Sequence, residues 1–546
     1  MKQFFFLLLS VISFSAYTQH TNFLLGKSYS SDINKMLYIE DMDLHTSFKP
    51  ILRSNLALNL CEILDKNYPN NYKNWLSRKV FSEHFIIIEG EDYKVVASPI
   101  INFSKGKELA DSKTIFTNSR GYLIEGDLGK KISFSTAFVE NQSIFPNYLD
   151  AYIRSNQVVP GQGYARNFKE TGFDYAMSSG YVTYRSNNMF AIQFGHGKNF
   201  IGDGYRSLLL SDNTFNYPYL KFQTTFWKVQ YTNLYAELMD INYFETHGLP
   251  NWDQMGFAKK YLSSHYLSYN ASANLQLSFF ESVVWRMNHA PGSRGFDVNY
   301  LNPIAMLRPI EFSLNSPDNV LLGLNTKYTL NSSYIYSQLI LDEFSITELR
   351  KNAGWWGNKI GYQLGYKIFD SFNVDRLTLQ AEYNFVRPYT YAHHNPQQNY
   401  AHYNQALAHP LGANFSEFLV MANYKWKRFE MDAQIMYARY GGDFQGDTIS
   451  YGSNLYFSTG NYAQDVDLIG MSSGRPADFG IEMYQGNLTT IDYKSLNLSY
   501  IINPHTNLKI NLGFTLRNFN NDNQEVKTKV INFGLMSDLF NHYYDI

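Results

Sequence analysis

The segment Leu508-Lys-Ile-Asn-Leu-Gly-Phe-Thr-Leu516 decides the fold, because large apolar side chains occupy every second position in it. The positions between them hold Lys509, Asn511, Gly513 and Thr515. A β-strand points successive side chains to opposite faces of its sheet. The segment therefore predicts a strand with one apolar and one polar face.

The same alternation recurs in both directions along the chain. Residues 496–502 alternate in the same way, and Asn503–Asn507 connects them to the first segment as a tight turn. Such a pair predicts a β-hairpin. Further hairpins are expected at residues 132–138, 181–194, 222–238 and 266–279, and a last strand at residues 529–540.

The connections between these strands fall into two lengths. One end of each hairpin is short, whereas the other continues into a long connection rich in aromatic residues, Asn and Gly. Outer-membrane barrels have short periplasmic turns and long outer loops, and at roughly 26 residues per repeat this chain holds about 18 strands. A soluble β-sandwich would not sort its loops in this way. The sequence predicts an all-β fold, a transmembrane antiparallel β-barrel, with residues 140–170 and 240–263 facing outward and the turn at 503–507 facing the periplasm.

The composition agrees with a barrel and excludes other classes of protein. Aromatic residues and charged residues each make up 17% of the 546-residue chain, so intrinsic disorder is excluded. The net charge of −2 gives no basic patch, so nucleic acid is not expected as a partner. Cys61 is the only cysteine, which excludes a disulfide framework.

The N-terminus predicts export. Lys2 precedes the apolar residues 4–9 and the small residues up to Ala16, which is the pattern of a signal peptide over residues 1–19. The apolar core is shorter than the ~20 residues that a membrane-spanning helix needs. Residues 20–82 are expected to form a small periplasmic helical region, with helices near 31–39, 54–66 and 74–81. Residues 83–546 would form the barrel, with loops that plug its lumen and outer-membrane lipid around it.

The glycine-rich segment 195–212 is the most unusual stretch of the sequence. Its glycines are similar to those of a phosphate-binding loop, but such a loop requires Gly-Lys-Ser/Thr between a buried strand and a helix. That context is missing here. The preferred interpretation is a constriction loop held by Arg206 and Asp212.

Histidines gather at His393, His394, His402 and His409. Imidazole is a common zinc ligand, but this spacing matches no compact ligand pattern. We expect these histidines to form hydrogen bonds within loops, and we expect neither a metal nor a cofactor.

Acidic and basic side chains could pair inside the barrel. Two carboxylates at a suitable separation could cleave glycosides, and Asp342, Glu343, Glu281, Glu311 and Glu382 offer such groups. Lumen ion pairs are the favoured alternative, and the sequence has no nucleophile elbow or zinc-protease motif, so no enzyme activity is expected. The expected lumen network consists of Arg206, Asp212, Arg308, Glu311, Asp342, Glu343 and Arg387.

Several segments taken together resemble the Wzi family of outer-membrane capsule-assembly proteins, and its Bacteroidetes branch of RemB-like gliding-motility proteins. The segments are 194–212, 300–304 with Arg308 and Glu311, 336–344, 386–393, and 408–414 with Glu417. They cover most of the chain between about residues 80 and 440, and their order makes the resemblance fairly specific.

The resemblance implies a barrel whose lumen is blocked by loops, with an N-terminal periplasmic helical part. The expected binding or lumen network also includes Tyr389, His402, His409 and Glu417. The resemblance also implies surface polysaccharide as a partner, in capsule assembly, together with a role in gliding motility. An accessory component of gliding or type IX secretion, acting through protein contacts, is the alternative, and a surface glycan hydrolase is the second.

Overall fold

The computed structural model describes residues 21–40, 43–53, 60–69, 72–241, 256–287, 295–304, 307–314, 316, 318–462 and 473–546. The expected signal peptide at 1–19 and the centre of the 240–263 connection lie outside the described residues. So do residues 54–59 of the second expected helix.

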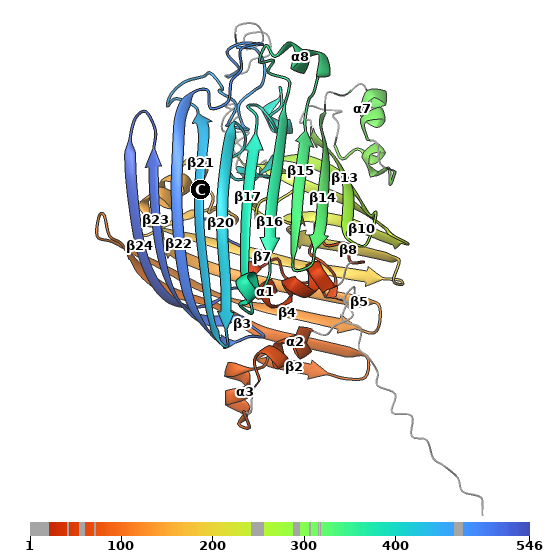
Figure 1. Cartoon of the computed structure of the whole chain (residues 1–546), viewed down its shortest axis with the longest axis vertical. Coiled ribbons are helices and arrows are strands. Elements are labelled where there is room, and N and C mark those ends of the chain that lie inside the picture. Colours follow the sequence, from red (N-terminus) through yellow and green to blue (C-terminus); the bar gives the residue numbers. More distant parts are fainter. Residues whose placement is uncertain are drawn as a thin grey trace, which may run out of the picture.

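The chain forms a closed antiparallel barrel of 18 strands within its described part (Figure 1). The ring closes where the last strand pairs with the first, from Met536↔Asn102 to Val530↔Glu108. The strands in ring order are β3 (Tyr93–Glu108), β4 (Lys113–Leu128), β5 (Ile132–Ile144), β7 (Gly172–Arg185), β8 (Phe190–Gly197), β10 (Tyr217–Phe226), β11 (Val229–Asp240), β12 (Ala258–Asn270), β13 (Leu275–Arg286), β14 (Asn319–Leu330), β15 (Ser333–Leu341), β16 (Ile360–Ile368), β17 (Leu377–Val386), β20 (Phe415–Trp426), β21 (Phe429–Gly442), β22 (Asn487–Asn503), β23 (Leu508–Asn520) and β24 (Glu525–Ser537).

The predicted hairpins are confirmed, and the loops sort by length as expected. Short turns such as 186–189, 227–228 and 504–507 lie on one rim, and all the long connections lie on the other. The expected last strand, 529–540, is wrong at both ends. β24 ends at Ser537 because the next residue, Asp538, pairs with inward-facing Lys509 at 2.6 Å, and residues 538–546 enter the lumen.

The two faces of the wall follow the alternation in the sequence. On β23, Ile510, Phe514 and Leu516 are exposed on the outside, while Lys509 and Asn511 are buried inside. An outward apolar belt over an inward polar face is what a transmembrane barrel requires. Exposed aromatic residues gather at the short-turn rim and form a girdle, consisting of Phe226, Trp227, Trp426 and Phe429.

The helices lie at the rims and in the lumen. They are α1 (Lys27–Lys35), continued by the π-helix η1 (Met36–Glu40), α2 (Leu60–Asn67), α3 (Trp75–Phe81), α4 (Asn147–Asn156), α7 (Arg308–Leu314) and α8 (Ile346–Lys351), with 3₁₀ turns η3 (Val298–Leu301), η4 (Ser371–Asn373) and η5 (Pro396–Gln398). Among the described residues, no helix is long and apolar enough to cross a membrane.

The first helix starts earlier than the cap expected at Ser31–Asp32. Its N-cap is Gly26, which makes no side-chain capping bond. The Asp32 carboxylate instead binds Lys425 at 2.8 Å and also pairs with Arg376. Tertiary ion pairs to the barrel wall therefore take the side chain that could have capped a helix.

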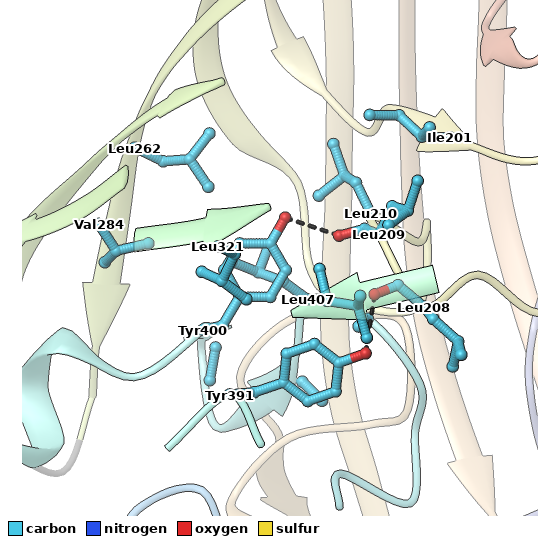
Figure 2. Close-up of a cluster of buried hydrophobic side chains, with 14 of the residues drawn as sticks. Ile201, Leu208, Leu209, Leu210, Leu262, Val284, Leu321, Tyr391, Tyr400 and Leu407 are labelled. Carbon is cyan, nitrogen blue, oxygen red and sulfur yellow. Dashed lines mark hydrogen bonds between the residues drawn. The ribbon is translucent and has the colours of Figure 1, made fainter. Parts of the chain in front are cut away.

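The lumen is filled by segments from several parts of the chain. The N-terminal strand β1 (Phe48–Lys49) pairs with β9 (Phe200–Ile201) of the loop between β8 and β10. That loop also buries Leu208, Leu209 and Leu210 against Tyr391, Tyr400 and Leu407 of the β17–β20 connection (Figure 2). The short strands β18 (Ala401–His402) and β19 (Gln405–Ala406) belong to this connection, whereas β2 (Ile86–Glu89) and β6 (Arg166–Phe168) extend the wall.

Candidate functional site in the barrel lumen

Arg206 lies at the centre of a buried ion-pair cluster. The loop between β8 and β10 carries Arg206 into the lumen, where only 2% of its side chain is exposed. Its Nη2 lies 2.9 Å from Glu417 Oε1 on β20 and 3.1 Å from Asp545 Oδ2 in the C-terminal segment. One guanidinium thus joins a loop, the wall and the segment after the last strand.

His409 extends the cluster on its far side. Its Nε2 lies 2.8 Å from Glu417 Oε2, and its Nδ1 accepts a hydrogen bond from the Leu411 N–H at 3.2 Å. An accepting Nδ1 carries no proton, so Nε2–H donates to the carboxylate. Burial lowers the pKa of His409, and the neighbouring Glu417 opposes that shift.

The glycine-rich loop wraps a carboxylate of the protein itself. Glu382 on β17 accepts from the main-chain N–H groups of Tyr205 at 2.7 Å and Arg206 at 3.1 Å, and from Tyr336 Oη at 2.7 Å. A Cβ on Gly204 would collide with the Glu382 carboxylate and lie 2.7 Å from the Tyr336 ring. The expected similarity to a phosphate loop thus has a physical basis, since successive N–H groups bind an anion.

Asp212 does not pair with Arg206 as expected. It accepts from Tyr543 Oη at 2.6 Å and from Asn541 Nδ2 at 2.8 Å. Residues of the C-terminal segment contact both side chains, since Asn541 and Tyr543 bind Asp212 whereas Asp545 binds Arg206. Asp212 therefore holds the C-terminal segment by neutral donors, while Arg206 holds it through Asp545.

Asp342 and Glu343 form a second, separate cluster with a lysine. Lys359 Nζ lies 3.1 Å from Glu343 Oε1 and 4.0 Å from Asp342 Oδ1. Asp342 also accepts from the Tyr391 N–H at 2.7 Å. Burial raises the pKa of Asp342. Among the described side chains, the partner of both carboxylates is thus Lys359, the residue before β16, and not Arg206 or Arg387.

Of the three other charged residues of the expected network, the structure describes the side chain of Arg387 alone. Arg387 forms no ion pair among the described residues, and its Nε has no hydrogen-bond partner there. Arg308 and Glu311 lie on α7 at the long-loop rim, and their side chains lie outside what the structure describes. Among the described side chains, Arg206 and the Asp342–Glu343 pair therefore lie in separate clusters, and the part of Arg308 and Glu311 stays a prediction.

Tyr389 and His402 hold the β17–β20 connection in place. Tyr389 Oη donates to the Ser450 carbonyl at 2.9 Å. His402 Nδ1 accepts from the Met239 N–H at 3.0 Å, while its Nε2 lies 3.2 Å from the Asn216 carbonyl. Burial lowers the pKa of His402 to about 3, so it stays neutral at ordinary pH.

Chemically, these clusters can hold loops to the wall through ion pairs and hydrogen bonds. Glu417 is fully buried and Glu382 is 1% exposed, so neither carboxylate meets solvent. No group of three or more His, Cys, Asp and Glu side chains within the described ranges is placed to hold a metal. Sequence reasoning missed Asp545 and did not give Glu382 its position in the cluster, and neither residue lies in a motif that could have identified it.

No protein-family model matches the sequence, and no curated protein matches it. Solved structures do share its fold. Wzi of Escherichia coli, described as an outer-membrane protein involved in group 1 capsule assembly and as a carbohydrate-binding β-barrel, is 13% identical with a TM-score of 0.51, over 94% of this chain and 99% of that chain. OprD of Pseudomonas aeruginosa is 11% identical over 84% and 96% of the two chains, with a TM-score of 0.42. OccAB2 of Acinetobacter baumannii is 9% identical over 82% of this chain and 99% of that chain, with a TM-score of 0.42. The fold is that of outer-membrane β-barrels.

Proposed function

We propose that this protein is a non-enzymatic outer-membrane β-barrel that retains or organises polysaccharide at the cell surface. The observation that carries the proposal is the filled lumen. Arg206, Glu417 and Asp545 lock a loop, the wall and the C-terminal segment together. Such a plug argues against free diffusion of solutes, which leaves the long-loop rim as the working surface.

The long-loop rim offers groups that suit sugars. Trp355 and Trp356, in the connection between β15 and β16, are partly exposed, and the Arg475 guanidinium lies 4.0 Å from the centre of the Trp356 ring. Asp478 Oδ1 lies 2.6 Å from Arg475 Nη2. Aromatic faces pack against the apolar faces of sugar rings, and fixed polar groups bond their hydroxyls.

The connection after β5 is also rich in aromatic residues. Tyr148 Oη donates inward to the Tyr544 carbonyl at 2.8 Å, so it helps to hold the plug. Tyr164 remains 39% exposed and available to a ligand. We therefore place the principal sugar contacts around Trp356.

The resemblance to Wzi-family proteins supports the capsule role, and the RemB-like segments favour a further role in gliding motility. An accessory component of gliding or type IX secretion would use the same barrel with a protein partner. A hydrolase would need solvent-accessible carboxylates, which Glu382 and Glu417 beside Arg206 do not supply because both are buried.

The test combines cells and purified protein. Deletion of the gene should reduce the polysaccharide retained on the cell surface, scored together with colony spreading. Purified barrel should bind the isolated surface polysaccharide, and Trp356→Ala should weaken that binding roughly tenfold, the loss of about 1.4 kcal/mol. Phe372→Ala, an exposed aromatic on the opposite rim, is the matched control. Loss of spreading with normal polysaccharide retention and no binding would favour the protein-partner alternative, and release of shortened glycan would favour the hydrolase.

A further inference from the structure

α3 and β2 lie beside the short-turn rim (Figure 1), and large apolar side chains are exposed on and between them. We call this the α3–β2 surface, and it consists of Trp75, Leu76, Val80, Phe85, Ile86 and Ile88. Trp75 is 58% exposed, Leu76 57% and Ile88 53%. An apolar cluster of this kind indicates contact with a membrane or a partner.

β2 continues the barrel wall below the end of β24. The pairing of β24 with β3 stops at Met536↔Asn102, although β3 runs on to Tyr93. β2 lies along the part of β3 that β24 does not reach, and pairs with it from Ile86↔Ala97 to Glu89↔Lys94. The outer face of β2 is therefore continuous with the outer face of the wall.

The side-chain directions on β2 follow from its neighbours. Ile87 lines a cavity of about 470 Å³ on the inner side, together with Val96 and His84. Because strand side chains alternate, Ile86 and Ile88 point to the outer side. That outer side is the one on which the barrel presents its apolar belt.

The backbone of β2 places it at the boundary of the membrane and not in the hydrocarbon. The Gly90 N–H donates to the Tyr93 carbonyl at 2.9 Å, so alternate residues from Ile88 onward bond to β3. The main-chain groups of Ile87 and Glu89 then point away from β3, at the free edge of β2 among the described strands. Unpaired backbone groups are not tolerated in hydrocarbon but are satisfied by hydrated headgroups.

Aromatic and basic residues nearby are typical of a position at the boundary of the membrane. Trp227 and Trp426 of the girdle lie on the same rim, where Trp and Tyr anchor proteins at membrane interfaces. Around α3, Lys73 and Arg78 are exposed, and Arg78 lies 3.4 Å from Glu83. Cations beside apolar groups suit lipid phosphates.

We propose that the α3–β2 surface binds phospholipid at the headgroup–acyl boundary of the periplasmic leaflet, and so fixes the N-terminal helical region to the membrane. Asn503 Nδ2 ties the intervening segment to the barrel by donating to the Lys79 and Glu83 carbonyls at 3.1 and 2.8 Å. The inference does not depend on what the long-loop rim binds.

The experiment measures the depth of single labelled sites. In a Cys61→Ser background, bimane is attached to a cysteine replacing Leu76 or Ile88, and the barrel is reconstituted in phosphatidylethanolamine–phosphatidylglycerol vesicles. We expect nitroxide near the headgroup to quench both labels roughly twofold more than nitroxide deep in the acyl chain, as for an interfacial segment. A label at Leu512 should be quenched most by the deep nitroxide. A label at exposed Asn188, in the β7–β8 turn, should be quenched most by a water-soluble quencher.

A second variant separates binding from folding. Trp75→Gln with Leu76→Gln should leave the barrel folded, judged by its heat-dependent gel mobility, yet reduce the lipid quenching at Ile88. The proposal is overturned if the labels at Leu76 and Ile88 behave like the Asn188 label. It is also overturned if they are shielded by a second copy of the chain, seen as a cross-linked dimer.

Discussion

At the scale of single residues, Arg206 is the cation of a buried ion-pair cluster in the lumen. Its guanidinium lies within ion-pair distance of Glu417 and Asp545, and all three side chains are nearly inaccessible to solvent. A buried pair contributes little net stability compared with apolar packing, but removal of one partner leaves the other charge uncompensated.

Arg206→Ala should therefore destabilise the folded barrel by about 3–5 kcal/mol, because two buried carboxylates lose their cation. Denaturant midpoints in detergent measure the change. Arg154→Ala is the matched control, since Arg154 pairs with Asp150 on the surface at 2.8 Å and should cost less than about 1 kcal/mol. Equal midpoints for the two variants would mean that the cluster does not hold the plug.

His402 gives the β17–β20 connection a pH dependence. Burial lowers its pKa to about 3 from the ordinary 6.5, so the unfolded connection binds more protons than the folded one between those values. Its contribution to stability is complete above pH 6.5 and is lost as the pH falls toward 3. Native-state proteolysis within residues 387–414 should accelerate over that window, and His402→Asn should flatten the acceleration. An unchanged pH profile in the variant would assign the dependence to other groups.

The residues also show where sequence reasoning ends. The segment 195–212 stands out by its glycines, and its anion-binding geometry is real. Its anion, however, is Glu382, which is 177 residues away from Tyr205 in the chain. Asp545 lies 339 residues from Arg206. No local pattern encodes such pairs, because the closure of the barrel alone brings them together.

At the scale of elements, the two-residue alternation fixes which way each strand faces. β23 carries Leu512 on the outer face, whereas Thr515 lines a cavity of about 410 Å³ in the lumen. Local alternation survives in the fold because a shift of one residue would turn every side chain to the wrong face. Strand ends were less predictable, as at β24, because Lys509 and Asp538 set the point where the chain turns inward.

Leu512→Arg should destabilise the barrel by about 2–4 kcal/mol, the cost of a cation at the lipid-facing midplane. Thr515→Arg should cost much less, because its side chain enters a polar cavity. Folding yields in lipid vesicles, compared between the two variants, provide the measurement. A similar loss for both would contradict the assignment of the faces.

At the scale of the whole molecule, the barrel is organised around its plug. The N-terminal segment enters from the short-turn rim and pairs with the β8–β10 loop, and residues 538–546 run back into the lumen beside it. Polar contacts hold the C-terminal segment along its length, among them those of Asn541, Tyr543 and Asp545. The barrel shape follows from the sequence pattern, but this interlocking does not, because irregular segments have no periodicity from which to place them.

We expect the C-terminal segment to control the ionic conductance through the lumen, since it lies along a cavity lined by β3, β22, β23 and β24. In planar bilayers, the native barrel should show little ionic conductance, because the plug occupies the lumen. Tyr543→Phe with Asp545→Asn removes the Tyr543 donor to Asp212 and the segment's own charge beside Arg206, so the segment should detach and the conductance should rise. Arg154→Ala, at the surface of α4, should leave the conductance at the native level. If the double variant folds and conducts no more than the native barrel, the plug is held by its packed leucines and tyrosines and not by these polar contacts.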